Sequence, residues 1–444
     1  MDDSVMIFSP TDVRYESAIG CDVHRDSIVC YSLAKAESGQ WVQTKGVFKT
    51  TNDSLRDFVN WCNSHNPQKI LMESTGIYWM PAYNSLEAAN LPIALVNPCH
   101  VKRMDGKKTD MEDACWLAKV AVNGTFTASY IPSIEYRNLR FECRNVTKMV
   151  DTLTSYKNRE TKLFASAGYK LSIFSDQFGA SAMIAKQAIL DGKSPAEVTA
   201  IVRAHGSKKV KATRKEMLEA FSGNMTETIR RTILCLRKIY NELERQIAEE
   251  KKFLIDTVKA LEGPAALLLK TIPGISDWTA TVVLIEIGGV VNFLRAFANC
   301  DRFAAWTALC PSNNQSANKK TGSKRRKGNK YLRRALCESA QAASRTKDTT
   351  FRSKYQSLVI RLGTKKSIVA IAHKIANMIY YVLKNNAPYV DPHIDYQQKS
   401  CEKNAARWCK QMALIEGMEF TLTNTKTGEV ITSQSLRDKN KSIS

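Results

Sequence analysis

The feature that most constrains the fold of this chain is a succession of short apolar segments in its first 122 residues. Strands are predicted wherever apolar and β-branched residues alternate or cluster, at 18–23, 27–33, 41–48, 70–72 and 93–96. Helices are predicted after the third strand, from Asn52 or Asp53 to Asn63, and then at 83–89 and 109–122. Three strands followed by alternating helices and strands indicate an α/β domain with a single sheet.

Four carboxylates lie where these elements would bring them together. Asp22 lies on the first strand, Glu73 ends the fourth, and Asp110 and Asp113 begin the helix that Thr109 would cap. Because residues i and i+3 share one helix face, the pair can meet the two strand acids. Together with the order of the elements, these positions indicate an RNase H-like domain. Clustered carboxylates repel each other unless cations bind them, and such oxygen ligands suit Mg²⁺ or Mn²⁺. Two such ions about 4 Å apart can hold a phosphodiester for in-line displacement.

Other charged residues near these four acids are weaker candidates for the same site. Glu112 lies between the helical pair but about 100° around the helix from Asp113, so it is expected to face solvent. Asp26 lies in the turn after the first strand and is a weaker ligand candidate, whereas Asp105 is the best substitute if the helix has another register. Two lysines before the helix could offset the ligand charge or contact the scissile phosphate, Lys107 and Lys108.

The distribution of charge points to a polyanionic partner. The formal net charge is +22, but residues 1–120 contain 12 Lys and Arg against 15 Asp and Glu, so the remainder carries +25. This asymmetry predicts a metal-dependent site in one domain and nucleic-acid binding in the others. A merely solvated basic surface is the plainer alternative.

Other compositional signals suggest an intracellular protein without a membrane span. The 12 cysteines include no CxxC pair, which favours buried free thiols over disulfides or zinc sites. The acidic start Met-Asp-Asp-Ser does not resemble a signal peptide, and the apolar run 282–294 is interrupted by Glu286. We therefore expect a soluble, intracellular protein.

The middle of the chain is predicted to be helical. Long helices are expected at 137–165 and 225–262, and apolar residues recur in the second at spacings of three and four. This spacing fits a coiled coil, which would join protomers, or equally a helix that packs on its own domain. After it, Thr271-Ile-Pro-Gly-Ile-Ser276 resembles the turn of a helix-hairpin-helix, in which Gly274 and Ser276 would present backbone N–H groups to a phosphate. A simple helix start is the alternative reading.

A basic loop follows between helices expected at 292–309 and 329–345. No Asp or Glu occurs from Phe303 to Cys337. Residues 319–334 contain nine basic side chains, which are Lys319, Lys320, Lys324, Arg325, Arg326, Lys327, Lys330, Arg333 and Arg334. So many like charges are best explained by phosphates beside them. A further helix is expected at 367–385 and a hairpin at 419–431.

In combination, these motifs resemble the DEDD transposases of bacterial insertion sequences. The resemblance covers about residues 15–385, and its motifs are Gly20-x-Asp22, Glu73-Ser-Thr-Gly76, Lys108-Thr-Asp-x-x-Asp-Ala114, Ile272-Pro-Gly-Ile275, Leu309-Cys-Pro-Ser-Asn-Asn-Gln-Ser316 and Lys327-Gly-Asn-Lys-Tyr-Leu-Arg-Arg334. It implies four segments: a RuvC-like catalytic domain at 1–130, a helical, coiled-coil region at 131–263, a mostly α-helical transposase domain at 264–386, and a tail of unknown role at 387–444.

The resemblance also implies a mechanism and its partners. A serine of the C-terminal domain would attack a DNA phosphate beside the metal-bound acids and form a covalent intermediate. The matching position is Ser316, although Asn318 stands where the family often has glycine, and Ser312 and Ser323 remain alternatives. The expected partners are donor and target DNA, a structured noncoding guide RNA, and further copies of the chain in a dimer or tetramer. The resemblance also implies a cytoplasmic bacterial protein that associates with the nucleoid when it is active.

Two other functions remain open on the sequence alone. A RuvC-like junction endonuclease would hydrolyse DNA with water at the same carboxylates and would need no serine. A non-catalytic nucleic-acid-binding scaffold would have purely structural acids. Metal-dependent cleavage separates the scaffold from both enzymes, and a covalent protein–DNA adduct separates the recombinase from the nuclease.

Overall fold

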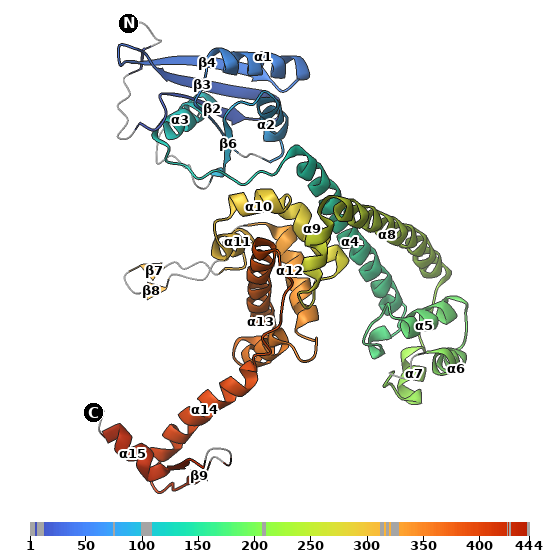
Figure 1. The fold of residues 1–444 in the computed structure, drawn as a ribbon. Helices are drawn as coiled ribbons and strands as arrows, with labels where there is room; N and C mark the ends of the chain where they lie inside the picture. The colour runs from blue at the N-terminus through green and yellow to red at the C-terminus, as the bar shows by residue number, and fades with distance from the viewer. Residues whose placement is uncertain are drawn as a thin grey trace. The chain divides into compact units, whose positions relative to one another are not determined.

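The computed structural model describes residues 5–6, 13–73, 76–98, 109–206, 210–310, 315–316, 319–320, 328–423, 425 and 428–441 (Figure 1). The chain divides into two compact units, residues 1–137 and residues 138–444.

The N-terminal unit is built on one six-stranded sheet. Its strands are β1 (Val5–Met6), β2 (Ser17–Val23), β3 (Ser27–Lys35), β4 (Trp41–Lys49), β5 (Lys69–Glu73) and β6 (Ile93–Val96), in the order β1-β4-β3-β2-β5-β6. The pairs β2–β3 and β3–β4 are antiparallel, whereas β2–β5 and β5–β6 are parallel. This mixed order, with the first long strand in the centre, is that of an RNase H-like sheet, and it confirms the predicted α/β class.

Helices cover both faces of this sheet. On one face, α1 (Asn52–Ser64) and α2 (Trp79–Ala88) pack against alternate strand residues such as Ile19, Cys21 and Ile70. On the other face, α3 (Asp110–Asn123) packs against Ala18 and Leu71. Because side chains alternate along a strand, the two faces of β2 have separate cores, and every residue of β2 after Ser17 is buried.

The structure corrects three details of the helices and strands predicted for this unit. The N-cap of α1 is Thr51 rather than Asn52 or Asp53, and its side chain makes no capping hydrogen bond. Helix α2 begins four residues earlier than predicted, at Trp79. The edge strand β1 was not predicted, since its two residues are too few to show an alternation.

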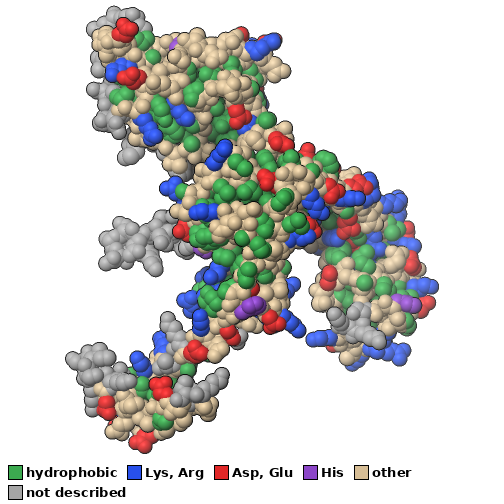
Figure 2. Space-filling view, viewed as in Figure 1, with side chains coloured by type: hydrophobic (Ala, Val, Ile, Leu, Met, Phe, Trp, Pro, Cys, Tyr) green, Lys and Arg blue, Asp and Glu red, His purple; other side chains and the backbone are tan. Residues whose placement is uncertain are grey.

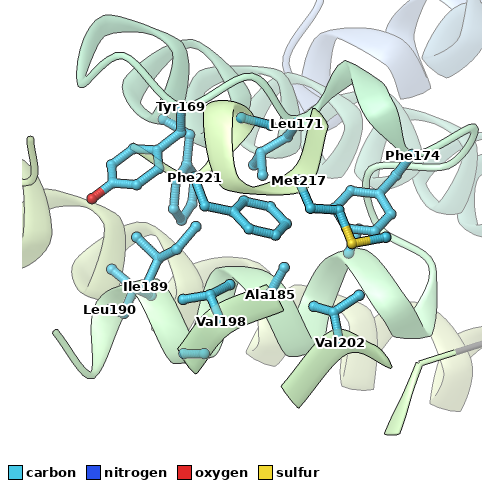
Figure 3. Close-up of a cluster of buried hydrophobic side chains, with 14 of the residues drawn as sticks. Tyr169, Leu171, Phe174, Ala185, Ile189, Leu190, Val198, Val202, Met217 and Phe221 are labelled. Atoms are coloured by element: carbon cyan, nitrogen blue, oxygen red, sulfur yellow. The ribbon is translucent and has the colours of Figure 1, made fainter. Parts of the chain in front are cut away.

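The second unit is mostly helical, as predicted. Its first part contains α4 (Ile134–Ser166), the 3₁₀ turn η2 (Leu171–Ile173), α5 (Ala180–Leu190), α6 (Pro195–His205) and α7 (Arg214–Ala220). Figure 3 shows how Leu171, Phe174, Ala185 and Phe221 from these elements meet in one apolar core. This core forms a small helical subdomain in the segment whose structure the sequence did not indicate.

The long helix α8 (Glu227–Lys270) lies beside α4 (Figure 1). The two helices are joined by ion pairs, in which Arg237 binds the fully buried Glu160 at 2.9 Å and Lys157 binds Glu244 at 2.5 Å. Helix α8 continues past the predicted end at Glu262, where the backbone kinks, as far as Lys270. Of the apolar residues that recur along α8, Ile233, Leu236 and Ile247 are buried within the chain, Ile229 and Leu243 are half-buried, and Ile239 is exposed.

The remaining helices form the core of the second unit and its tail. They are α9 (Asp277–Ile287), α10 (Val290–Ala296), α11 (Cys300–Trp306), α12 (Lys330–Ala343) and α13 (Thr350–Asn385), followed by α14 (Tyr396–Ala413) and α15 (Ser433–Lys441). Short hairpins pair β7 (Gln315–Ser316) with β8 (Lys319–Lys320), and β9 (Thr421–Thr423) with β10 (Val430–Thr432). Helix α13 starts 17 residues before the predicted 367, with a kink at Gly363.

No single helix in the described part of the chain combines the length and apolar character needed to span a membrane. Helices α9 and α10 have that length and apolar character only when they are taken together, and the chain bends by 54° between them.

Candidate metal centre and nucleic-acid interface

The parallel pairing of β2 with β5 brings two predicted site residues to the same level of the sheet. Cys21 is in register with Met72, so that Asp22 and Glu73 are the next residues on adjacent strands. By alternation, Asp22 faces the same side as Ala18, and Glu73 the same side as Leu71. Ala18 and Leu71 both belong to the core beneath α3. Both strand acids therefore lie on the sheet face that α3 covers.

Helix α3 approaches this face unusually closely because of one glycine. A Cβ at Gly20 would lie 2.1 Å from the carbonyl oxygen of Ala114 and 2.4 Å from the nitrogen of Ala118. The helix begins as predicted, with the Thr109 side chain accepting a hydrogen bond from the Glu112 backbone N–H at 3.3 Å. Its first turn therefore carries Asp110 and Asp113 to the end of β2.

The closest contacts in this group pass through a histidine. Nε2 of His24 lies 3.1 Å from Oδ2 of Asp22 and 3.4 Å from Oδ1 of Asp110. One ligand atom from each of these three residues lies within 4.8 Å of the others, an arrangement that could hold a metal ion. The sequence prediction missed His24. The available signal was its position two residues after Asp22, which puts both side chains on one side of an extended chain.

The electrostatics of the group favour a bound cation. Burial raises the pKa of Asp22, and the charges of Asp110 and Asp113 raise it further, whereas His24 lowers it. The Asp22 side chain is only 10% exposed, but that of Asp110 is 60% exposed, so the group is open to solvent on the Asp110 side. A divalent cation would relieve this repulsion, and the donor set of carboxylate oxygens and one imidazole nitrogen fits Mg²⁺ or Mn²⁺.

The other predicted acids contribute unequally. Asp113 is half-buried and lies near enough to act on the charge of Asp22. Glu73 is half-buried at the end of β5, outside the three-residue group. Asp26 is exposed and binds Arg25 at 2.7 Å, which lowers the pKa of its carboxyl. Glu112, predicted to face solvent, is half-buried, because the side of α3 that carries it is partly covered. Asp105, Lys107 and Lys108 lie outside the described residues.

The predicted nucleophile lies in the β7–β8 hairpin. Its backbone pairs Ser316 with Lys319 in antiparallel register. The side chains of Ser316, Lys319 and Lys320 lie outside the described part of the chain, as do Ser312 and Ser323 and the basic residues Lys324, Arg325, Arg326 and Lys327.

The downstream end of this loop is firmly anchored. The Asn329 backbone N–H donates to the Trp306 carbonyl at 3.0 Å, and its side-chain oxygen caps α12 by accepting from the N–H groups of Tyr331 and Leu332. Asn329 Nδ2 also donates to Oε2 of Glu286 at 2.6 Å. Glu286 is fully buried and forms two hydrogen bonds of 2.8 Å with Arg144. Asn329 and the start of α12 are therefore fixed to the helical core.

The basic residues at the start of α12 differ in how freely they could bind a phosphate. Lys330 lies over the Tyr331 ring at 5.1 Å. Arg333 is half-buried, and its Nε finds no hydrogen-bond partner among the described residues. Arg334 is engaged by Asp151 at 2.6 Å and by Glu338 at 3.0 Å, so a phosphate would have to compete with two carboxylates for it.

The predicted phosphate-binding turn has a structural explanation as well. Gly274 has φ +88°, and a Cβ there would lie 2.3 Å from the Ser339 carbonyl oxygen. The Ser276 side chain caps α9 by accepting from the Thr279 N–H at 3.2 Å. Glycine is thus required by packing against α12, and serine by the helix start, whether or not a phosphate binds.

Two family models match the chain. The DEDD transposase model of the IS110 group, described as "Transposase", matches residues 19–167, and the model described as "Transposase IS116/IS110/IS902 family" matches residues 266–356. The first match contains the four predicted acids, and the second contains Ser316. None of the curated proteins compared matches the chain.

Among solved structures, similarity is found to one titled "Thermus thermophilus RuvC structure". The identity is 13%, the alignment covers 26% of this chain and 99% of that chain, and the TM-score is 0.21. The fold assignment above therefore rests on the strand order. The two transposase models match successive parts of one chain and together span more than half of its 444 residues. The chain belongs to the DEDD transposase family of IS110-type insertion sequences.

Proposed function

We propose that this protein is a metal-dependent DNA recombinase that mobilises an insertion sequence through a covalent serine–DNA intermediate. The observation that carries the proposal is the group formed by Asp22, His24 and Asp110, with Asp113 beside it, at the end of the central strand. Carboxylates are gathered here at a cost in repulsion, and a catalytic cation would account for that cost.

In this proposal, Asp22, Glu73, Asp110 and Asp113 hold Mg²⁺ or Mn²⁺. When bound, the ion supplies Lewis-acid stabilisation of charge that develops on the phosphate oxygens. Asp22 is held in place by the sheet, whereas Asp110 and Asp113 are held by the first turn of α3. His24 can complete the ligand set or orient the Asp22 carboxylate through the 3.1 Å contact.

The proposed chemistry is phosphodiester exchange on Ser316. Its Oγ attacks the phosphorus, the Oγ–P bond forms, the bond to the leaving deoxyribose oxygen breaks, and that oxygen receives a proton as the serine loses one. One phosphodiester replaces another, so strands can be rejoined without ATP. Lys319, in register with Ser316 across the hairpin, belongs to the basic segment that would offset the charge of the reacting phosphate.

The proposed partners follow from charge. The net charge of +25 outside residues 1–120 suits binding of donor DNA, target DNA and a structured guide RNA. The basic residues that we propose to contact their phosphates are Lys319, Lys320, Lys324, Arg325, Arg326, Lys327, Lys330, Arg333 and Arg334, with Gly274 and Ser276 at the turn before α9. We further propose a homo-oligomer, in which the serine of one protomer completes the acid site of another.

The test compares two acid-to-amide substitutions in a strand-exchange assay with Mg²⁺. Asp22→Asn removes a proposed metal ligand and should reduce exchange by about a hundredfold or more. Asp26→Asn is the matched control, because Asp26 lies four residues after Asp22, is exposed and is paired with Arg25. Exchange by Asp22→Asn at the rate of the control would refute the assignment of the metal site.

A water-dependent junction nuclease is the second candidate. The observation in its favour is that the Asp22–His24–Asp110 group forms entirely within the N-terminal unit and needs no serine. A Ser316→Ala variant that still cuts DNA at the wild-type rate would favour the nuclease, whereas loss of cutting with DNA binding retained would favour the recombinase.

A further inference from the structure

A pocket that no part of the proposed catalytic machinery uses lies in the second unit. Its volume is about 320 Å³, and it is formed by α13 and by the segment 387–396, which folds back along that helix. The lining is mainly aromatic and aliphatic, with one lysine, and includes Phe351, Lys374, Met378, Tyr381, Tyr389 and Tyr396.

The wall of this pocket is preorganised. Phe351 is buried, and its ring stacks on that of Tyr389 with centroids 5.7 Å apart and an interplanar angle of 21°. Asp391 fixes the segment by accepting hydrogen bonds from the Thr350 and His393 backbone N–H groups. The Tyr389 N–H in turn donates to Oγ1 of Thr271 at 2.8 Å. Tyr381 is 45% exposed, so its ring remains accessible to an incoming group.

The helix that lines the pocket is strongly basic. Residues 350–385 contain seven Lys and Arg and no Asp or Glu. Lys374, which lines the pocket, lies 5.5 Å from the centre of the Tyr396 ring, and Lys354, which lies outside the lining, is 4.1 Å from the same ring centre. Lys and Arg side chains, shown in blue, are visible around the junction of α13 and α14 (Figure 2). An anionic ligand with an apolar, planar part would match this combination of charge and shape.

We propose that the pocket binds an unstacked nucleobase of single-stranded nucleic acid, with an adjacent phosphate on Lys354 and Lys374. Aromatic rings beside basic side chains are the usual means by which proteins bind single strands. The pocket lies near the lower end of the size range for small-ligand sites, which suits one base and excludes a duplex. A basic helix also disfavours an apolar protein segment as the occupant. This inference deepens the proposed function, since recombination and RNA guidance both produce unpaired strands.

The test measures binding of the full-length protein to short single strands in EDTA. Thymidine DNA and uridine RNA oligonucleotides are each compared with an abasic strand of the same length, which keeps the phosphates and lacks the bases. Tyr381→Ala should weaken binding of the base-containing strand by about tenfold and leave binding of the abasic strand unchanged. The DNA and RNA arms show which kind of strand the pocket prefers.

Two controls make the result specific. Tyr355→Ala changes another tyrosine of α13 that does not line the pocket, and it should affect neither strand. A base-containing strand with one iodouracil should photocross-link within residues 378–396 of the wild-type protein. The proposal would be overturned if Tyr381→Ala weakened binding to both strands equally, or if it weakened binding to neither. A change of oligomeric mass without a change in binding would also overturn it, because the pocket would then contact a second copy.

The assay needs neither metal nor serine, so it is independent of the proposed catalysis. If Asp22→Asn recombines DNA normally but Tyr381→Ala loses base-dependent binding, the metal assignment fails and the pocket proposal stands. The reverse pattern would overturn the pocket and leave the proposed function intact.

Discussion

At the residue scale, the proposed metal site depends on what holds Asp22 in a buried position. Asp22 is buried on the sheet face that α3 covers, and its carboxyl lies near two further acids and one imidazole. Burial and the neighbouring carboxylates disfavour its ionised form, and the resulting rise in pKa means that ionised Asp22 destabilises the metal-free fold. That destabilisation is absent at low pH and sets in as the pH rises through the raised pKa.

Asp22→Asn should therefore raise the thermal unfolding temperature in EDTA at neutral pH, because the uncharged amide removes the repulsion. Mg²⁺ or Mn²⁺ should raise the unfolding temperature of the wild-type protein but leave that of the variant almost unchanged. Differential scanning calorimetry with and without metal measures both effects. A variant that is less stable in EDTA and still stabilised by metal would mean that Asp22 has another role.

At the scale of elements, the spacing between α3 and β2 determines whether the acids can meet. Gly20 allows this spacing, since any Cβ there would overlap the helix backbone at Ala114 and Ala118. The helix backbone cannot yield locally without breaking its own hydrogen bonds. A side chain at position 20 must therefore move α3 as a whole, together with Asp110 and Asp113.

Gly20→Ala should destabilise the protein by about 1–3 kcal/mol through overpacking and should also lower strand exchange. Gly263→Ala is the matched control, because a Cβ there meets nothing within 4 Å. Denaturant unfolding and the exchange assay measure the two effects. If Gly20→Ala left stability and strand exchange unchanged, α3 would not be packed as closely on β2 as proposed, and its position would not depend on the glycine.

The sequence predicted those elements that appear as short apolar runs between turn residues or as a helix with one apolar face. Strands β2, β3, β5 and β6 are buried on both faces and appear as nearly continuous apolar runs, whereas α3 shows its buried residues at helical spacing. The small helices α5 to α7 could not be predicted, because short helices that are buried on several sides show no clear period. Ala185 of α5 is one of the core residues of these helices. His24 was missed because its one local signal is its position two residues after Asp22, and its contact with Asp110 depends on the tertiary packing of α3.

At the scale of the whole molecule, the chain separates its charges between a slightly acidic N-terminal region and a strongly basic remainder. The acids bind metal in the proposal, and the basic region binds polyanions. Salt weakens phosphate binding by restoring the counterions that binding releases, so the slope of log affinity against log salt reports how many phosphates the protein neutralises.

Replacing Lys324, Arg325, Arg326 and Lys327 with glutamine should reduce that slope by about 0.9 for each duplex DNA phosphate that the variant no longer neutralises. Arg245→Gln is the control, since Arg245 is exposed but already paired with Glu242 and Glu249. Fluorescence anisotropy over a range of salt concentrations measures the slope. The same slope for the fourfold variant and the wild-type protein would exclude direct phosphate binding by these residues.

In the proposed mechanism Ser316 becomes covalently joined to DNA beside the carboxylate group, and mass spectrometry of a trapped reaction can detect that bond. The wild-type protein is incubated with a nicked suicide substrate and Mg²⁺, digested, and searched for a nucleotide adduct. An adduct is expected on the peptide that contains Ser316, and none is expected in Ser316→Ala or in Asp22→Asn. Strand exchange without any adduct, or an adduct on Ser312 or Ser323, would contradict this mechanism.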